Sequence, residues 1–260
     1  MYIDDPVFPK PDDKNTKIWR YLDIPKFLSL IDNRALFFSR ADYLGDPFEG
    51  SIPKTTGQIN LNNDKNSGKP GTIVFSDDGT PHEAYTMHDF FRKTGYICSF
   101  HVNSFESAGL WSIYSKSKQG VAIQSTFDRL CNCFHVDNKE NERISLVKYI
   151  DYETETIPVS KNAYLALVHK RKSYEHEKEL RAIITFPVEV FPHGGELPKE
   201  ILDNFPKGIL IPVDLDILIE KIYLAPTSPP YMQELLKSIT RKYEINKDIM
   251  QSALDDTPII

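Results

Sequence analysis

The spacing of apolar and polar residues along the chain predicts short strands interleaved with short helices. Strands are indicated by alternating or short apolar runs between turn residues, and helices by apolar positions that recur every three or four residues. The predicted strands are 17–23, 35–39, 96–101, 120–123, 145–152, 177–186, 208–212 and 221–224, and the predicted helices are 25–33, 82–93, 106–115, 127–133, 162–172 and 229–243. Because helices and strands alternate irregularly and no internal repeat occurs, the pattern favours a single α+β domain over a doubly wound sheet.

Two segments depart from this pattern. Residues 1–16 are polar and contain three prolines and four aspartates, which predicts a loosely ordered N-terminal arm ahead of a domain at 17–255. Residues 53–82 are dominated by Asn, Gly, Lys, Thr and Asp. This composition predicts a solvated, mobile insertion within the domain.

Composition and charge narrow the classes of function. The 260 residues carry a formal net charge of −6, which argues against capture of nucleic acid or anionic membrane by bulk charge. No apolar run reaches 18 residues, and the first residues lack the basic and apolar regions of a secretory signal. With only three cysteines, the chain is typical of a reduced, cytoplasmic protein, and no metal site is expected.

The segment at 177–184 has the most distinctive chemistry. At strand spacing, Glu177, Glu179 and Arg181 share one face, while the alternate apolar residues share the other. Two carboxylates about 7 Å apart along a strand can bind a sugar hydroxyl and stabilise a cationic sugar transition state. The alternative interpretation is a solvated face on which Arg181 forms a salt bridge.

A second candidate is the turn at 45–50, which contains two glycines and a proline. Asp46 and Glu49 in this turn could ligate a metal or orient a substrate, or they could stitch the turn together by accepting backbone N–H bonds. The chain lacks the glycine fingerprints of phosphate-binding and dinucleotide-binding loops.

Further candidates stand apart along the sequence. Arg20 on the first strand could grip a phosphate in a bidentate manner or lie on the surface. Trp111 and Tyr114 lie three residues apart on a predicted helix and would either stack on a ligand or belong to the core. The basic run at 170–172 could meet a nucleotide or form a solvated helix end. His169 or His176 could act as a general base, although a surface histidine is the simpler interpretation.

The order of several motifs resembles a known family. The motifs are Trp-Arg-Tyr-Leu-Asp, Ala-Leu-Phe-Phe-Ser, Gly-Asp-Pro-Phe-Glu, Cys-Ser-Phe-His, Leu-Trp-x-x-Tyr, Gly-Val-Ala-Ile and Tyr-x-x-Glu-x-Glu-x-Arg. Over residues 17–185 this order resembles the largely bacterial family catalogued as domain of unknown function 2971. The family has no settled activity, so the resemblance implies a fold more than a reaction.

The layout is also similar to the ADP-ribosyltransferase fold, which implies a split, mixed or antiparallel central sheet with flanking helices. By this analogy the cofactor is NAD, and Glu179 would bond the nicotinamide ribose and stabilise the oxocarbenium ion. Glu177 would orient or activate the acceptor, which is a protein, a nucleic acid or water. The residues that would bind NAD are Arg20, Tyr21, Ser99, Trp111 and Tyr114.

Three hypotheses follow. The first is an NAD-dependent ADP-ribosyltransferase-like enzyme or NAD glycohydrolase in bacterial defence or a toxin system. The second is a non-catalytic module that binds a nucleotide or a protein, in which the carboxylates are structural. The third is a metal-dependent phosphoesterase or nuclease built on Asp46, Glu49 and Glu179. None of the three involves a membrane.

Overall fold

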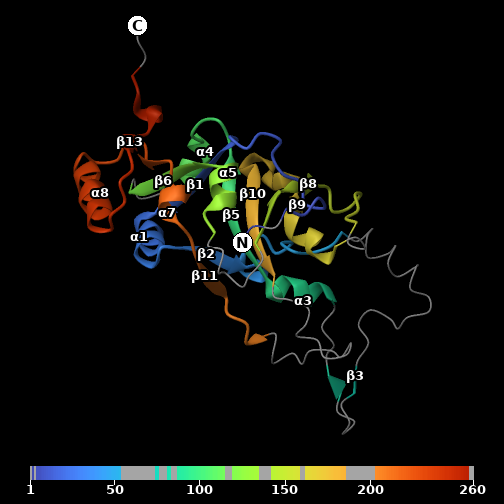
Figure 1. The fold of residues 1–260 in the computed structure, drawn as a ribbon. Coiled ribbons are helices and arrows are strands. Elements are labelled where there is room, and N and C mark those ends of the chain that lie inside the picture. Colours follow the sequence, from blue (N-terminus) through green and yellow to red (C-terminus); the bar gives the residue numbers. More distant parts are fainter. Residues whose placement is uncertain are drawn as a thin grey trace.

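The computed structural model describes residues 2, 4–53, 74–75, 81–82, 87–114, 119–134, 142–158, 162–185 and 203–257. Most of the insertion predicted at 53–82 therefore lies outside the described residues. Within them, the chain forms a nine-stranded sheet with helices on both faces (Figure 1).

The main sheet is mixed, as the resemblance implies, and almost every strand pair in it is antiparallel. Its strands are β1 (Lys17–Asp23), β2 (Ala35–Arg40), β5 (Gly95–Val102), β6 (Gly120–Thr126), β7 (Arg143–Leu146), β10 (Glu179–Thr185), β11 (Gly208–Pro212), β12 (Lys221–Leu224) and β13 (Ile249–Gln251). The strand order is β11-β2-β5-β1-β6-β12-β13, with β10 and then β7 attached to β5, and only β12 and β13 run parallel. Two small pairs lie apart from this sheet: β3 (Val74–Phe75) with β4 (Pro81–His82), and β8 (Lys148–Ile150) with β9 (His169–Arg171).

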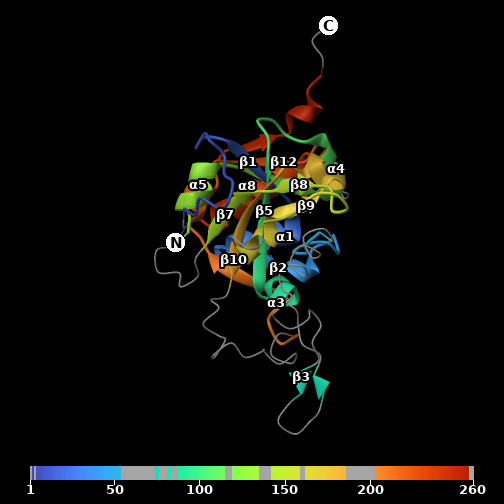
Figure 2. The same ribbon diagram turned by 90° about the vertical axis from the view of Figure 1, so that its right-hand side faces the viewer.

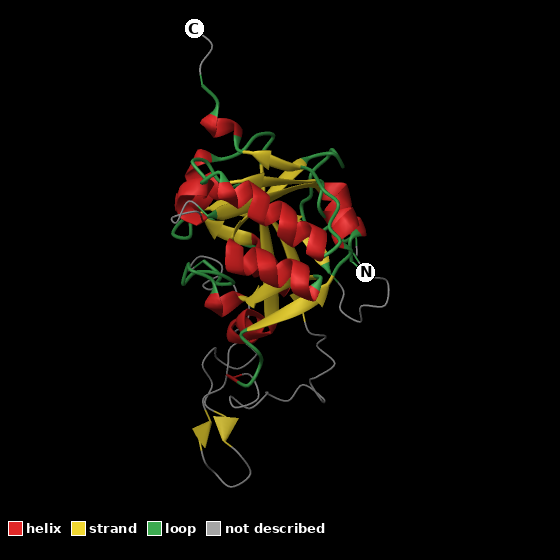
Figure 3. Ribbon diagram, turned by 90° about the vertical axis from the view of Figure 1, so that its left-hand side faces the viewer, coloured by secondary structure: helices red, strands yellow, loops and turns green. Residues whose placement is uncertain are grey.

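Helices cover both faces of the sheet. The α-helices are α1 (Ile24–Asn33), α3 (Met87–Thr94), α4 (Ala108–Tyr114), α5 (Phe127–Asn132), α7 (Leu215–Leu218) and α8 (Tyr231–Lys242), and the 3₁₀ helices are η1 (Ala41–Tyr43), η2 (Ala163–Val168), η3 (Lys172–Glu177) and η6 (Ala253–Asp255). Figure 3 shows α1 and α8 across one face. Figure 2 shows α4, β8 and β9 on the opposite side.

The central strand β5 is the point at which the sheet splits. Along one edge, β10 pairs with β5 from Gly95 to His101. Along the other edge, β2 pairs only with Tyr96 and Ile97, and β1 pairs only with His101 and Val102. Residues 98–100 consequently have no strand partner on that edge within the described residues, so β1 and β2 diverge there.

Period-two alternation separates the core into clusters on the two faces. Leu180, Ala182 and Ile184 of β10 belong to the largest cluster, which the helices α1, α5, α7 and α8 cover. Ile183 faces a second cluster with η2 and β8. Trp19 and Tyr21 of β1 form a third cluster with α4. The polar residues of β10 therefore lie on the same side as the second cluster.

The structure confirms the residue ranges of β1, β11 and β12, and it confirms Asp23 as the cap of α1, because its carboxylate accepts from the backbone N–H of Lys26 at 2.8 Å. It corrects two others. The helix predicted at 162–172 is the short η2 followed by the strand β9, and the strand predicted at 145–152 is divided into β7 and β8. Both segments pack against neighbours that single-sequence periodicity does not reveal.

The N-terminal segment packs against the domain, in contrast to the loosely ordered arm that its composition predicts. Phe8 is 3% exposed within the second cluster. The carbonyl oxygen of Pro9 accepts hydrogen bonds from the backbone of Leu146 and the hydroxyl of Ser145. Residues 1–16 are mostly polar, but the buried side chain of Phe8 attaches this segment to the core.

Replacing this anchor tests the packed arrangement. We expect Phe8→Ala to lower the free energy of unfolding by about 3–5 kcal/mol, because it removes a buried aromatic ring and leaves a cavity. The control is Phe105→Ala, whose side chain is 78% exposed; we expect a change within about 0.5 kcal/mol. Urea denaturation measures both, and equal, small effects would show that the segment does not contribute to the core.

Candidate functional site

A pocket of about 460 Å³ lies where the sheet splits. Its walls come from β1, β2, β5 and β10, from the turn after η1, and from β9 and η3. This volume is in the range of small-molecule sites. The strand divergence at β5 thus creates a cavity in the middle of the sheet rather than at its edge.

Arg20 takes the place of the missing strand. Its Nη1 donates to the carbonyl oxygen of Ser99 at 2.7 Å, and its guanidinium lies 5.5 Å from the centre of the Phe100 ring. Among the described residues, Arg20 forms no ion pair with a carboxylate. The pocket wall therefore holds a guanidinium whose positive charge is not neutralised by a neighbouring side chain.

Ser99 connects this arginine to the carboxylate of Glu179. While its carbonyl accepts from Arg20, its hydroxyl donates to Oε2 of Glu179 at 2.6 Å. The pairing of β5 with β10 sets this geometry, because Ser99 is opposite Arg181 in the register and His101 is opposite Glu179. Both ends of the Arg20–Ser99–Glu179 chain line the pocket.

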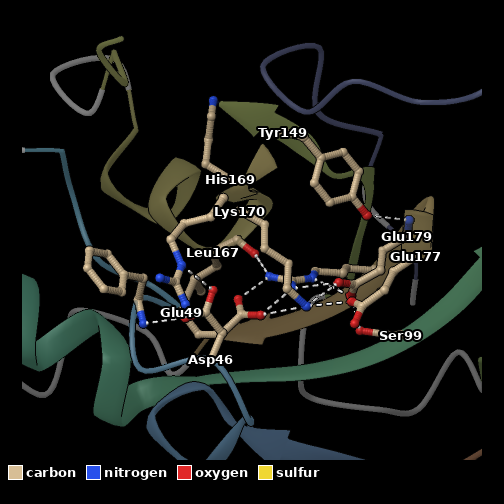
Figure 4. Close-up of polar contacts among 12 residues, drawn as sticks. Asp46, Glu49, Ser99, Tyr149, Leu167, His169, Lys170, Glu177 and Glu179 are labelled. Atoms are coloured by element: carbon tan, nitrogen blue, oxygen red, sulfur yellow. Dashed lines mark hydrogen bonds and ion pairs between the residues drawn. The ribbon is translucent and has the colours of Figure 1, made fainter. Parts of the chain in front are cut away.

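Arg181 lines the pocket, is completely buried and makes five hydrogen bonds. Its partners Glu49, Leu167 and Glu179 are labelled in Figure 4. Nη1 and Nη2 each bond an oxygen of Glu49 at 2.8 Å, and Nε and Nη2 bond Glu179 at 2.9 and 3.1 Å. Nη1 also donates to the carbonyl oxygen of Leu167 at 2.7 Å. Five donors thus meet five acceptor contacts, which satisfies the guanidinium fully.

Lys170 is the second cation of this cluster. Its Nζ lies 2.6 Å from Glu177, 2.7 Å from Glu179 and 3.1 Å from Glu49. We call these five side chains, Glu49, Lys170, Glu177, Glu179 and Arg181, the charge cluster. With every group ionised it holds three negative charges and two positive ones, so one negative charge is in excess.

The pKa values of the two neighbouring glutamates are shifted in opposite directions. Burial would raise the pKa of Glu179, but Arg181 and Lys170 outweigh it and hold the pKa well below its ordinary value. Burial and the adjacent Glu179 raise the pKa of Glu177, with Lys170 opposing them. Glu179 is therefore the member of the pair that is held as an anion, and Glu177 is the member that takes up a proton more readily.

Local backbone geometry brings the two glutamates to one lysine. The sequence predicts Glu177 on the strand, but β10 begins at Glu179, and Glu177 ends the 3₁₀ helix η3. Lys178 between them has φ 41°, in the left-handed region. This bend ends the alternation, so Glu177 does not share the strand face by period two as predicted. The face is also buried and ion-paired rather than solvated.

The turn at 45–50 is stabilised by the carboxylate of Asp46, which agrees with the structural interpretation of this turn. Asp46 accepts the backbone N–H of Phe48 at 3.0 Å, and Gly50 has φ 67°. Asp46 also pairs with Arg171 through Nη2 at 2.7 Å and Nε at 3.2 Å. The turn thereby delivers Glu49 to Arg181.

The aromatic candidates fall in different places. Tyr21 lines the pocket and its hydroxyl accepts from the backbone N–H of Ser107 at 2.8 Å. Tyr114 lines the pocket and is 46% exposed, and burial together with Glu177 and Glu179 raises its pKa. Trp111 is buried against Tyr21, with ring centres 4.9 Å apart, and does not line the pocket. The structure favours the core interpretation for Trp111.

Sequence reasoning missed Lys170 and His101 as specific members of the site. In the sequence, Lys170 is only one member of the basic run at 170–172. The strand β9, which orients it toward the charge cluster, lies in a segment that the sequence predicts to be helical. His101 lines the pocket. His169 and His176, the histidines that the sequence singles out, do not line it, and Nδ1 of His169 bonds the carbonyl of Leu165 at 2.6 Å.

Asp46, Glu49 and Glu179 do not converge on one point. Asp46 pairs with Arg171, whereas Glu49 and Glu179 converge on Arg181. In the described part of the chain, no three His, Cys, Asp or Glu side chains are grouped to hold a metal ion. No helix within the described ranges is long and apolar enough to cross a membrane.

The buried arginine gives a test of the charge cluster. We expect Arg181→Ala to lower the free energy of unfolding by about 3–5 kcal/mol, because it leaves buried carboxylates without their main cation. The control is Lys237→Ala, which breaks an exposed pair with Glu234 at 3.0 Å and should change stability by under about 1 kcal/mol. Urea denaturation at pH 7 compares the two, and similar small losses would contradict the cluster's structural role.

Comparison with solved structures gives a distant likeness over nearly the whole chain. One is Thermus sp. 2.9 DarT in complex with NAD⁺, with 9% identity, a TM-score of 0.40, and coverage of 94% of this chain and 99% of that chain. The same protein in complex with ADP-ribosylated single-stranded DNA gives 11% identity and a TM-score of 0.40, covering 95% and 98%. Likeness at this level does not bear on the reaction. No curated protein matches the chain.

The family comparison covers a shorter stretch. Residues 110–182 match the family described as Protein of unknown function (DUF2971). The matched segment includes Lys170, Glu177, Glu179 and Arg181 of the charge cluster, whereas Arg20, Glu49 and Ser99 precede it. The resemblance noted in the motifs is therefore confirmed for the part of the chain that supplies most of the charge cluster.

Proposed function

We propose that this chain binds NAD in the pocket at the sheet split and cleaves the bond between nicotinamide and ribose. The ADP-ribosyl group then passes to an acceptor or to water. The observation that carries the proposal is the continuous chain Arg20–Ser99–Glu179 along one pocket wall. It supports the proposal because a guanidinium without a carboxylate partner and a carboxylate held as an anion line the same cavity.

In the proposed complex, Arg20 binds a phosphate group of the ligand. The pocket also contains Lys26, Lys170 and Arg181, but each of these cations pairs with a carboxylate. Arg20 keeps donors for an added anion, because a guanidinium has five N–H groups and the partners recorded for it are the Ser99 carbonyl, through Nη1, and the Cys98 thiol. A guanidinium can bind a phosphate through two parallel N–H bonds.

In the proposed reaction, the charge cluster acts at the bond between nicotinamide and ribose. As the C–N bond breaks, nicotinamide leaves as a neutral molecule with the bonding electron pair, and positive charge develops on the ribose. The excess negative charge of the cluster, of which Glu179 is the fixed member, stabilises that cation in a largely water-excluded wall. Because these groups are already held in place, they need no reorganisation when the charge develops.

Glu177 supports the final step. Its carboxyl is the more exposed of the two, its pKa is raised by burial and by Glu179, and it lines the pocket. In its ionised form it would take the proton from an acceptor O–H or N–H as the new bond to the ribose forms. The acceptor classes are a protein, a nucleic acid or water.

One observation favours a second candidate, a nucleotide-binding module without catalysis. The oxygens of Glu179 already accept from Lys170, Ser99 and twice from Arg181. A carboxylate offers about four lone-pair positions, so a ribose hydroxyl would have to displace one of these donors. Ser99, the neutral one, is the donor whose displacement costs least.

Nicotinamide release separates the two candidates. We expect the wild-type protein and Glu179→Gln to bind NAD in calorimetric titrations, and Glu179→Gln to release nicotinamide about 10²–10³-fold more slowly, because it loses the fixed charge. Chromatographic quantification of nicotinamide gives the rate. Binding by both proteins without release by either would identify the binding module, and no binding by the wild type would overturn the proposal.

The phosphate role of Arg20 has a matched control in the same pocket. We expect Arg20→Ala to weaken ADP-ribose binding about 10–100-fold, through loss of a charged hydrogen bond of about 1.5–3 kcal/mol. Lys26→Ala removes another positive charge at the pocket, but one already paired with Asp23 at 3.2 Å, and should leave the affinity nearly unchanged. Equal losses in both variants would indicate general attraction rather than a phosphate contact.

A further inference from the structure

His101 is a buried residue at the pocket that the proposed chemistry does not use. It lies on β5 two residues beyond Ser99, so both side chains emerge on the same face. It is 5% exposed and lines the pocket. Its Nδ1 is 2.7 Å from the carbonyl oxygen of Glu177.

This hydrogen bond fixes the tautomer of the ring. A carbonyl oxygen can only accept, so Nδ1 must carry a hydrogen. Burial lowers the pKa of His101, and Lys178 and His176 lower it further, against the opposing effect of the Glu177 carbonyl. The imidazole is consequently neutral at pH 7, and Nε2 presents a lone pair without a hydrogen.

Nε2 is also without a protein partner. It is buried and has no hydrogen bond to any residue that the structure describes. The ring of Tyr21 is the aromatic neighbour, with centroids 6.3 Å apart, Lys178 and His176 are the charged neighbours, and Glu179 is opposite His101 in the register of β5 with β10. A buried acceptor left unsatisfied costs about 1–3 kcal/mol, whereas the polar atoms of Ser99 and Arg181 on the same side of the sheet all find partners.

We infer that His101 is a ligand-positioning residue whose Nε2 accepts a hydrogen bond from a ribosyl hydroxyl of the bound ligand. The neutral ring can accept but cannot donate at this atom, so it selects a neutral donor and not a phosphate. Arg20 binds the anion in the proposed function, whereas His101 presents a neutral acceptor, and both residues line the same pocket as Ser99 and Glu179. The inference rests on the proposed function, because it assigns His101 to the sugar of the same ligand.

A direct hydrogen bond between His101 and a ribosyl hydroxyl can be tested by removing the hydroxyl from the ligand and the Nε2 acceptor from the protein, separately and together. The probes are ADP-ribose and its analogues that each lack one ribosyl hydroxyl, titrated into the wild-type protein and His101→Asn. The asparagine amide can still donate to the Glu177 carbonyl but has no acceptor at the position of Nε2. We expect about tenfold weaker binding of ADP-ribose to His101→Asn, which corresponds to one buried hydrogen bond.

The coupling between the two deletions decides the outcome. For one analogue, the tenfold loss seen with the wild type should vanish in His101→Asn, because the partner is already gone. If every analogue loses the same affinity in both proteins, His101 does not contact a hydroxyl. If the wild type binds none of the probes, the proposed function fails and this inference with it. Thermal unfolding of each variant confirms that it is folded.

The pH dependence and a rescue variant exclude a merely structural role. As the pH falls through the lowered pKa of His101, Nε2 gains a hydrogen and becomes a donor, so wild-type affinity for ADP-ribose should fall below about pH 6. His101→Gln places an amide oxygen near the position of Nε2, so it should bind more tightly than His101→Asn and lack this acid loss. An acid loss that persists unchanged in His101→Gln would assign it to another group and overturn the inference.

Discussion

Everything at the centre of this molecule is arranged around one buried positive charge. The guanidinium of Arg181 is fully removed from water, which would be prohibitive without compensation. The carboxylates of Glu49 and Glu179 compensate it, and their own burial requires a second cation, Lys170, to be close. Because Glu49 comes from the turn at 45–50 and Lys170 from β9, the charge cluster fixes two separate segments against the face of β10 that carries Glu179 and Arg181.

The split in the sheet depends on the same principle of complete hydrogen bonding. Where β1 and β2 diverge from β5, the carbonyl of Ser99 would be left without a partner, and Arg20 supplies the donor. A side chain thus replaces a strand at one position. The cavity formed in this way is lined by residues of four strands of the sheet, and the turn after η1, β9 and η3 complete its walls.

Much of the secondary structure was predictable from the sequence, and the reason is the regular pattern of its apolar residues. The strand Lys17–Asp23 and the cap at Asp23 follow from local rules. The layout of Arg20, Ser99 and Glu179 was predictable only through the resemblance to known folds. The burial of Arg181 was not predictable, because a Glu-x-Arg pattern on a strand is the same whether the arginine faces water or a distant carboxylate. Here that carboxylate belongs to Glu49, 132 positions away. Lys170 was missed for a related reason, since its inward orientation depends on the pairing of β9 with β8.

The span between Glu49 and Arg181 also orders the events of folding. Closing a loop of this length is slow and has a large entropy cost before any contact compensates for it. Among the described residues, Glu49 pairs only with Lys170 and Arg181, which lie far away in the sequence, so its buried pair with Arg181 can be stable only after the segments that carry these residues have come together and excluded water. The pocket at the sheet split therefore acquires its native electrostatics only when these distant segments have joined, and a nascent or partly unfolded chain has the sequence motifs without the charge cluster.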